Sequence, residues 1–137
     1  MDFRITIKKG IPWQREQIIA LYEDAGWTAY LNDTDKLIRA INNSQSVYSA
    51  YIGERLAGLA RTISDGESIS YIQDLLVLKE YKRLGIGTKL MAAVINENPH
   101  IRRFVLMTDI DPVADSFYKS VGFKPAKEAG CIVYIKE

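Results

Sequence analysis

Two closely spaced glycines, Gly85 and Gly87, follow a lysine-rich loop and open a segment with helical periodicity. Glycine at the start of a helix lets the backbone turn tightly and lets a ligand approach without meeting a side chain. The first turn of a helix also carries N–H groups that lack intrahelical acceptors, and these groups attract anions. Residues 79–89 include Lys79, Lys82, Arg83 and Lys89 against the single acidic residue Glu80. This combination is typical of a pyrophosphate site.

Two simpler interpretations of this segment stay open at the level of sequence. Glycines at a strand-to-helix turn often serve packing alone, and a lysine-rich loop is often only a solvated surface. Neither common phosphate fingerprint fits, because GxxxxGK[ST] is absent and GxGxxG fails where Lys89 and Leu90 follow Gly87 and Thr88.

Hydrophobic periodicity predicts the elements that would position this turn. A strand over residues 68–78 ends in the apolar run LLVL, which is typical of a strand covered on both faces. Apolar residues then recur at helical spacing from Ile86 to Val94, and a second buried strand follows at residues 101–108. A strand, a helix and a strand with short connections form a right-handed parallel unit.

The segments before this unit predict one strand, two helices and a meander. Alternating apolar residues predict the strand at residues 3–7, and helical spacing predicts helices over residues 13–25 and 34–41 with a loop between them. Strands at residues 47–52 and 56–64 complete the meander.

The segments after this unit predict a last helix and closing strands. Asp111 is a suitable N-cap and Pro112 suits the first helical position. We expect the closing strands at Phe123 and at residues 131–136. The predicted fold class is α/β with a mixed sheet.

Composition and charge exclude several classes of protein. The chain is 47% hydrophobic and 26% charged, which rules out disorder and collagen-like repeats. A formal net charge of +1 argues against bulk electrostatic binding to nucleic acid or an anionic membrane. One histidine, His100, and one cysteine, Cys131, are too few for a zinc cluster, so we expect no metal site. Cys131 lies in the apolar run CIVYI, so we expect a buried, inert thiol rather than a nucleophile.

Length and apolar run lengths set the expected organisation. The 137 residues predict a single domain over residues 1–137. No apolar run approaches the about 20 residues that span a bilayer, and the first residues lack a signal-peptide core. We therefore expect a cytoplasmic protein.

Two motifs resemble those of the GNAT acyltransferases. The run Lys82-Arg83-Leu84-Gly85-Ile86-Gly87, after a strand that ends Leu75-Leu76-Val77, is similar to motif A of that family, Q/R-x-x-G-x-G/A. Residues 114–123, ADSFYKSVGF, look like its AxxFYxxxGF helix. The resemblance implies a mixed, mostly antiparallel sheet with splayed central parallel strands and about four helices. It also implies an N-acetyltransferase that moves an acetyl group from acetyl-CoA to a primary amine of a small molecule or peptide.

The resemblance also implies where acetyl-CoA, the co-substrate, would bind. The backbone of Leu75, Leu76 and Val77 would pair with the pantetheine amides, and the N–H of Leu76 or Val77 would stabilise the oxyanion. The N–H groups that would hold the pyrophosphate belong to Arg83, Leu84, Gly85, Ile86, Gly87 and Thr88. Further cofactor contacts are implied at Lys82, Asp111 and Phe117. Lys82 stands where the family usually has Gln or Arg. Asp111 stands where many members have Asn.

Two residues are candidates for proton transfer. By resemblance, the hydroxyl of Tyr118 would protonate the departing CoA thiolate, and the alternative is a core aromatic that only orders the sulfur. Asp74 is the nearest ionisable side chain on the fourth strand and could take a proton from the amine or serve as a structural hydrogen-bond acceptor. Alternation places Tyr71 and Gln73 on the face opposite Asp74, as possible holders of water.

The acceptor side carries weaker signals. Residues 16–35 contain five acidic residues and no Lys or Arg, and this segment includes Trp27 and Tyr30. An acidic wall with these aromatics would suit binding of a cationic amine substrate. The alternative is that the acids lie on solvated helix faces and that the aromatics cap the core.

Other functions of the same fold stay open. One is transfer of a longer acyl group, and another is a non-catalytic acyl-CoA-binding or regulatory domain, although such a domain has no need of a proton donor at Tyr118. The sequence does not identify the amine. It also leaves the oligomeric state open, although homodimers are frequent in the family.

Overall fold

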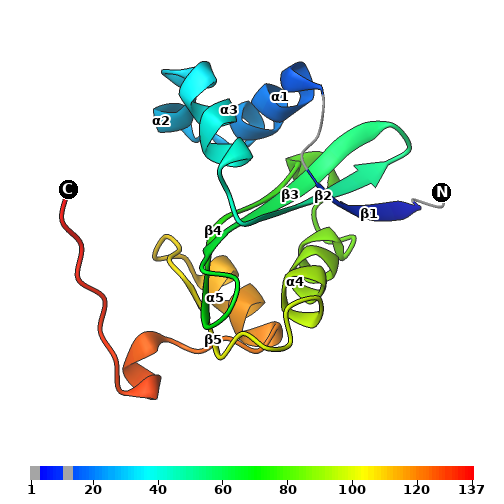
Figure 1. Ribbon diagram of the computed structural model, residues 1–137. Helices are drawn as coiled ribbons and strands as arrows, with labels where there is room; N and C mark the ends of the chain where they lie inside the picture. Colours follow the sequence, from blue (N-terminus) through cyan, green and yellow to red (C-terminus); the bar gives the residue numbers. More distant parts are fainter. Residues whose placement is uncertain (1–3, 11–13) are drawn as a thin grey trace. The chain divides into compact units, whose positions relative to one another are not determined.

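The computed structural model describes residues 4–10 and 14–137 (Figure 1). The chain divides into two compact units, Met1–Met107 and Thr108–Glu137. Phe3 and Trp13, the first residues of the predicted first strand and first helix, lie outside the described residues. Within the described part, no helix combines the length and the apolar character that crossing a membrane requires.

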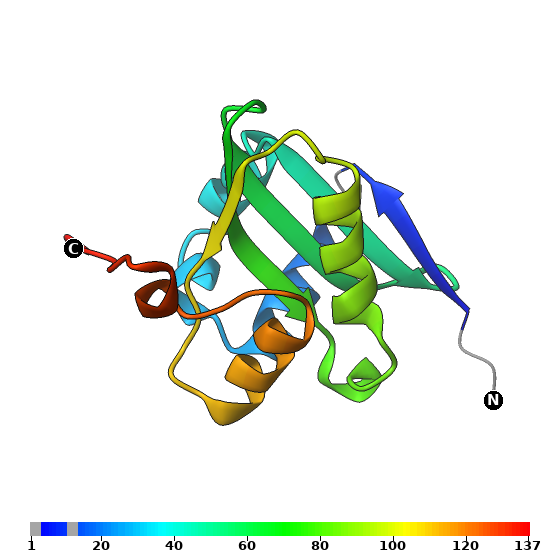
Figure 2. The same ribbon diagram turned by 90° about the horizontal axis from the view of Figure 1, so that it is seen from below.

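The first unit is built on a five-stranded sheet in the order β1-β2-β3-β4-β5 (Figure 2). Its strands are β1 (Ile5–Lys9), β2 (Ser46–Ile52), β3 (Arg55–Ser64), β4 (Ile69–Val77) and β5 (Arg103–Leu106). Neighbouring strands are antiparallel except for the parallel pair β4 and β5. The structure thus confirms the mixed sheet, with the parallel pair at one side of it.

Helices cover both faces of this sheet (Figure 1). On one face lie α1 (Arg15–Ala25), α2 (Thr28–Leu31) and α3 (Thr34–Asn42), and on the other lies α4 (Ile86–Asn96). The apolar side chains of α1 and α3 meet those of β2, β3 and β4 in a core that includes Leu21, Leu37 and Leu59. A loop was predicted where α2 lies. That prediction was wrong, because four residues are too few to show a helical period in the sequence.

The second unit contains α5 (Pro112–Ser120) and the 3-10 helix η2 (Ala126–Ala129). The predicted cap is confirmed, since a side-chain oxygen of Asp111 accepts a hydrogen bond from the N–H of Val113 at 3.3 Å. Gly122 follows α5 with a φ of 98°, a left-handed conformation that favours glycine. This residue therefore ends the helix as predicted.

The predicted closing strands are absent from the described residues of the second unit. A strand requires a neighbour to complete its hydrogen-bonded ladder, and residues 131–137 have none there. The same run carries Cys131, which is exposed. The prediction of a buried thiol was therefore wrong, because an apolar run is buried only when another element covers it.

Candidate active site

The second half of β4 has a free edge. Pairing between β4 and β5 ends at Ile72 and Leu106, whereas β4 continues to Val77. On its other side β4 stays paired with β3 up to Val77, opposite Gly58. Residues 73–77 therefore present one row of backbone groups without a strand partner in the described part of the chain. This is the splay that the resemblance predicts.

Alternation along β4 decides which amides lie on the free edge. The N–H of Leu78, just beyond the strand, donates to the carbonyl oxygen of Ala57 on the β3 side at 2.9 Å. The carbonyl oxygen of Leu76 also lies on that side, within 2.8 Å of the place where a Cβ on Gly58 would stand. Because successive residues of a strand direct their backbone groups to opposite sides, Leu75 and Val77 face the free edge.

An anion cradle, defined here as the N–H groups of residues 83–88, follows directly. A 3-10 turn, η1 (Lys79–Tyr81), leads from β4 to Arg83, whose φ of 67° is left-handed, and to Gly85 with a φ of 85°. Left-handed residues in such a turn bring successive N–H groups into a concave nest. None of the N–H groups of residues 83–88 has a hydrogen-bond acceptor among the described residues. The cradle therefore offers several donors to one ligand.

Charge around the cradle is positive. The side chains of Lys82, Arg83 and Lys89 are exposed, so they are available to a phosphate. The one acidic residue of the loop, Glu80, is paired with Arg55 at 2.5 Å. Because an arginine from β3 neutralises this carboxylate, it opposes an anionic ligand less than the sequence alone suggests.

A close contact between helix and sheet positions the cradle. A Cβ on Gly58 of β3 would lie 3.0 Å from Ile86 and 3.1 Å from Leu90, two buried side chains of α4. Only a residue without a side chain allows α4 to approach the sheet this closely. Gly58 therefore sets the position of the first turn of α4 relative to β4.

The side chain of Asp74 is fully buried in a polar network on the α1 face of the sheet. One carboxylate oxygen accepts hydrogen bonds from the Tyr22 hydroxyl at 2.7 Å and from Nε of Arg61 at 2.8 Å. The other accepts from the Tyr30 hydroxyl at 3.1 Å. The exposed fractions of the Arg61 and Asp74 side chains are 5% and 0%. Both oxygens of Asp74 are thus engaged by the protein.

Burial changes the acidity of the tyrosines in this network. Burial, followed by the neighbouring Asp74 carboxylate, raises the pKa of Tyr22 and that of Tyr30. Both phenols are therefore neutral at physiological pH and act as hydrogen-bond donors to the carboxylate.

A β-bulge places Gln73 on the same side as Asp74. Asp74 pairs with Arg61 and Ile72 pairs with Thr62, so Gln73 is an extra residue that has no partner on β3. Its Nε2 donates to the Tyr30 hydroxyl at 3.1 Å, and Tyr30 in turn contacts Asp74. The prediction that Gln73 lies on the face opposite Asp74 was wrong. Strict alternation does not hold across a bulge.

The register places Tyr71 on the Asp74 face as well. Tyr71 pairs with Ile63, and Asp74 pairs with Arg61, two residues away from Ile63 on β3. Residues two apart on a strand share a face. The predicted opposite face for Tyr71 was therefore wrong for the same reason, the bulge.

Two members of the network, Tyr22 and Arg61, were not predicted from the sequence, and Gln73 was predicted only as a holder of water on the opposite face. A signal existed for Arg61, because it is the only charged residue in the run LAGLARTI of a strand that reads as buried. A buried charge requires a partner of opposite sign, and Asp74 on the next strand is the nearest candidate. No sequence signal marks the bulge.

Of the two aromatic residues predicted for the acceptor side, Tyr30 belongs to this network and Trp27 packs beside it. The ring centroids of Trp27 and Tyr30 are 6.0 Å apart, and both rings pack against Tyr22. Three of the five acids of this segment have partners in the protein: Asp24 accepts from the N–H of Lys79, Asp33 caps α3, and Asp35 pairs with Arg15. These contacts give those acids structural roles.

The remaining predicted residues lie in the second unit. The ring of Tyr118 makes edge contacts with Phe117 at 5.1 Å and with Phe123 at 6.1 Å between centroids. Burial raises the pKa of the Tyr118 hydroxyl. The phenol is therefore protonated at neutral pH.

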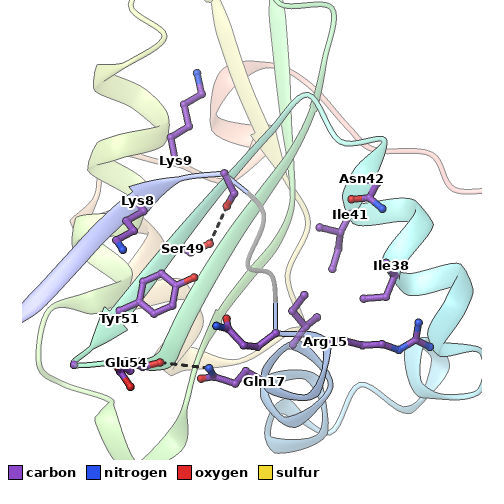
Figure 3. Close-up of a pocket in the computed structure, with 14 residues that line it drawn as sticks. Lys8, Lys9, Arg15, Gln17, Ile38, Ile41, Asn42, Ser49, Tyr51 and Glu54 are labelled. Carbon is purple, nitrogen blue, oxygen red and sulfur yellow. Dashed lines mark hydrogen bonds between the residues drawn. The ribbon is translucent and has the colours of Figure 1, made fainter.

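A cavity of about 970 Å³ lies on the α1 face of the sheet, next to β1 and β2 (Figure 3). Its lining includes Lys8 of β1, Ile18 of α1, Ile41 of α3 and Tyr51 of β2. No residue of the cradle or of the Asp74 network lines it. It is therefore separate from the site described above.

Comparison with known proteins decides the family. The model of the acetyltransferase (GNAT) domain matches residues 12–133 of the chain. The chain belongs to the GNAT family. A solved GNAT-family acetyltransferase of Streptococcus pneumoniae is 32% identical to this GNAT chain, with a TM-score of 0.86 and 98% of each chain covered. The resemblance inferred from the two motifs is thereby confirmed.

Two further relatives extend the comparison. A curated protein of Gibberella zeae, named as an acetyltransferase, is 35% identical over 75 residues, which are 52% of this GNAT chain and 41% of that protein. An aminoglycoside N-acetyltransferase solved in complex with CoA is 15% identical, with a TM-score of 0.72 over 100% of this chain and 97% of that one. The second likeness is one of fold alone.

Proposed function

We propose that this GNAT protein is an N-acetyltransferase that moves the acetyl group of acetyl-CoA to a primary amine of a small molecule or peptide. The observation that carries the proposal is that the anion cradle adjoins the free edge of β4. Acetyl-CoA has a pyrophosphate next to an extended arm with two amide groups. The N–H groups of residues 83–88 suit the pyrophosphate, and the free backbone groups of Leu75 and Val77 suit the amides.

The dimensions of the free edge support this fit. Residues 73–77 span about 16 Å at roughly 3.3 Å per residue, which is enough for an extended arm with two amides. The edge leads directly into η1 and the cradle, so the two ends of one ligand would be held by consecutive segments of the chain.

The proposed chemistry is direct attack. The amine nitrogen bonds to the thioester carbonyl carbon, the carbon–sulfur bond breaks, and the products are an amide and CoA. Negative charge develops on the carbonyl oxygen during attack, and a fixed backbone N–H stabilises it. We assign this role to Val77 rather than Leu76, because the backbone groups of Leu76 face β3.

The amine must lose a proton before it attacks. An alkyl amine has a pKa near 10.4, so presenting it in the neutral form at pH 7 costs about 4–5 kcal/mol. Asp74 is a poor candidate for the base, because its side chain is fully buried and its oxygens already accept three hydrogen bonds. We assign Asp74 to holding Tyr30 in place and assign removal of the proton to water at the free edge.

The departing thiolate needs a hydrogen-bond or proton donor. We assign that role to Tyr118, whose hydroxyl is protonated at neutral pH. The family resemblance of residues 114–123 supports this assignment.

Coenzyme binding is tested by a matched pair of glycine substitutions. Gly85 in the cradle and Gly53 in the β2–β3 turn both have left-handed φ values, 85° and 61°, and open space where a Cβ would stand. Each alanine variant therefore carries the same kind of backbone strain. Gly85→Ala is expected to weaken CoA binding about tenfold by titration calorimetry, whereas Gly53→Ala leaves it unchanged. Equal affinities for the two variants would contradict the cradle.

Transfer is tested by release of free thiol from acetyl-CoA over a panel of primary amines, with mass spectrometry of the acetylated products. Turnover of at least one amine is expected. Tight CoA binding without turnover of any amine would favour the non-catalytic binding domain instead.

A further inference from the structure

Gln73 is an exposed side chain with one end fixed and the other end free. Its Nε2 donates to the Tyr30 hydroxyl, while its Oε1 has no hydrogen-bond partner among the described residues. The residue is the extra residue of the bulge and also the first residue of β4 beyond the last pair with β5. It therefore lies where the free edge begins.

The buried network dictates which end of the amide is free. As a carboxylate, Asp74 can only accept a hydrogen bond from the Tyr30 hydroxyl. Arg61 can only donate to that hydroxyl, and its Nη2 lies 3.1 Å from the hydroxyl oxygen. The hydroxyl proton of Tyr30 is therefore directed to Asp74, and its oxygen is left to accept from Arg61 and Gln73. An amide that meets such an oxygen must present its NH₂ group. The carbonyl oxygen of Gln73 is consequently turned away from Tyr30.

We propose that Oε1 of Gln73 accepts a hydrogen bond from the amino group of the acceptor substrate, and so makes Gln73 a specificity-determining residue. The proposal rests on the proposed N-acetyltransferase function. A neutral carbonyl oxygen binds an N–H without removing its proton, and the nitrogen lone pair stays available for attack once water has taken the proton. A primary amine supplies the N–H donor, whereas a tertiary amine does not once it has lost its proton. Arg61 and Asp74 act through Tyr30 as positioning residues.

Kinetics of three variants test this recognition. Gln73→Met keeps the length of the side chain and removes the oxygen, so the amine KM is expected to rise about tenfold, while the KM for acetyl-CoA is unchanged. Tyr30→Phe keeps the oxygen but releases the amide, so a smaller rise of about threefold is expected. In the Gln73→Met background, Tyr30→Phe should have no further effect, because both act through one oxygen.

A matched control is Tyr51→Phe, which removes a hydroxyl group that has no hydrogen-bond partner within residues 4–10 and 14–137. Its amine KM should equal that of the unmodified protein. If the role of Tyr30 were purely structural, Tyr30→Phe would change the amine KM by the same factor whether position 73 holds Gln or Met. That result, or an unchanged amine KM in Gln73→Met, would overturn the proposal.

A second measurement does not depend on turnover. In ¹⁵N-labelled protein saturated with CoA, the side-chain NH₂ signal of Gln73 is identified by its loss in Gln73→Met. Addition of the amine panel should shift this signal. Turnover without any shift overturns the role of Gln73 and leaves the enzyme assignment intact. A shift without turnover of any amine supports amine recognition and overturns the enzyme assignment. Neither shift nor turnover overturns both.

Discussion

Replacing Asp74 by asparagine should strongly destabilise the fold. The substitution preserves size but leaves the charge of Arg61, a residue that is only 4% exposed, without its counter-charge. Removing one partner of a buried ion pair costs about 3–5 kcal/mol, because the remaining charge stays desolvated. For 137 residues this corresponds to a fall in Tm of about 10–17 °C. Urea unfolding followed by circular dichroism measures the loss as a lower midpoint at an unchanged slope.

The matched control for this prediction is Asp35→Asn. Asp35 also pairs with an arginine, Arg15, at 2.6 Å, but its side chain is 71% exposed. Solvent screens an exposed pair and rehydrates the partner that is left, so the urea midpoint should hardly change. If the two asparagine variants unfold at the same urea concentration, the reasoning about the buried network is wrong.

Three further predictions concern other parts of the molecule. Gly58→Ala brings a Cβ to 2.8 Å from a backbone carbonyl oxygen. The free energy of unfolding measured in urea titrations should therefore fall by about 1–3 kcal/mol. An unchanged value would contradict the close contact. Burial raises the pKa of the Tyr22 hydroxyl above its ordinary value of 10. Just above pH 10 the hydroxyl therefore loses its proton in the unfolded chain but keeps it in the folded protein. Unfolding free energy should therefore fall by about 1.4 kcal/mol per pH unit beyond pH 10, a contribution absent from Tyr22→Phe. Tyr118→Phe should lower kcat about 100-fold at saturating acetyl-CoA, whereas Tyr134→Phe, at an 89% exposed residue, should not. An unchanged kcat in Tyr118→Phe would refute the donor role.

The elements around the cradle could be predicted from the sequence because local signals determine them. An apolar strand, a glycine-rich turn and an amphipathic helix each depend on residues close together in the chain. The predicted helix at residues 34–41 agrees with α3 to within one residue. The same local signals placed Gly85 and Gly87 at the start of α4.

The network around Asp74 could not be predicted, because it joins residues that are far apart in the sequence. The Tyr22 hydroxyl and Asp74 are separated by 52 residues, and Tyr30 and Gln73 by 43. Their meeting depends on how α1 and α2 pack on the sheet, and on a bulge that no residue type announces. The prediction of the closing strands was wrong for a related reason. A β-prone run such as residues 131–136 forms a strand only where a neighbouring edge is offered to it.

If Gln73 recognises the acceptor as proposed, the bulge in β4 separates the requirements of folding from those of substrate choice. Without Gln73, every other residue of β3 and β4 would keep its present partner and its present face, so the sheet has no need of this position. Substitutions at Gln73, which is exposed, are not limited by packing as substitutions at the buried residues Ile72 and Asp74 are. On the proposed role of Gln73, natural variation at this one position would change which acceptors are recognised at little cost to folding.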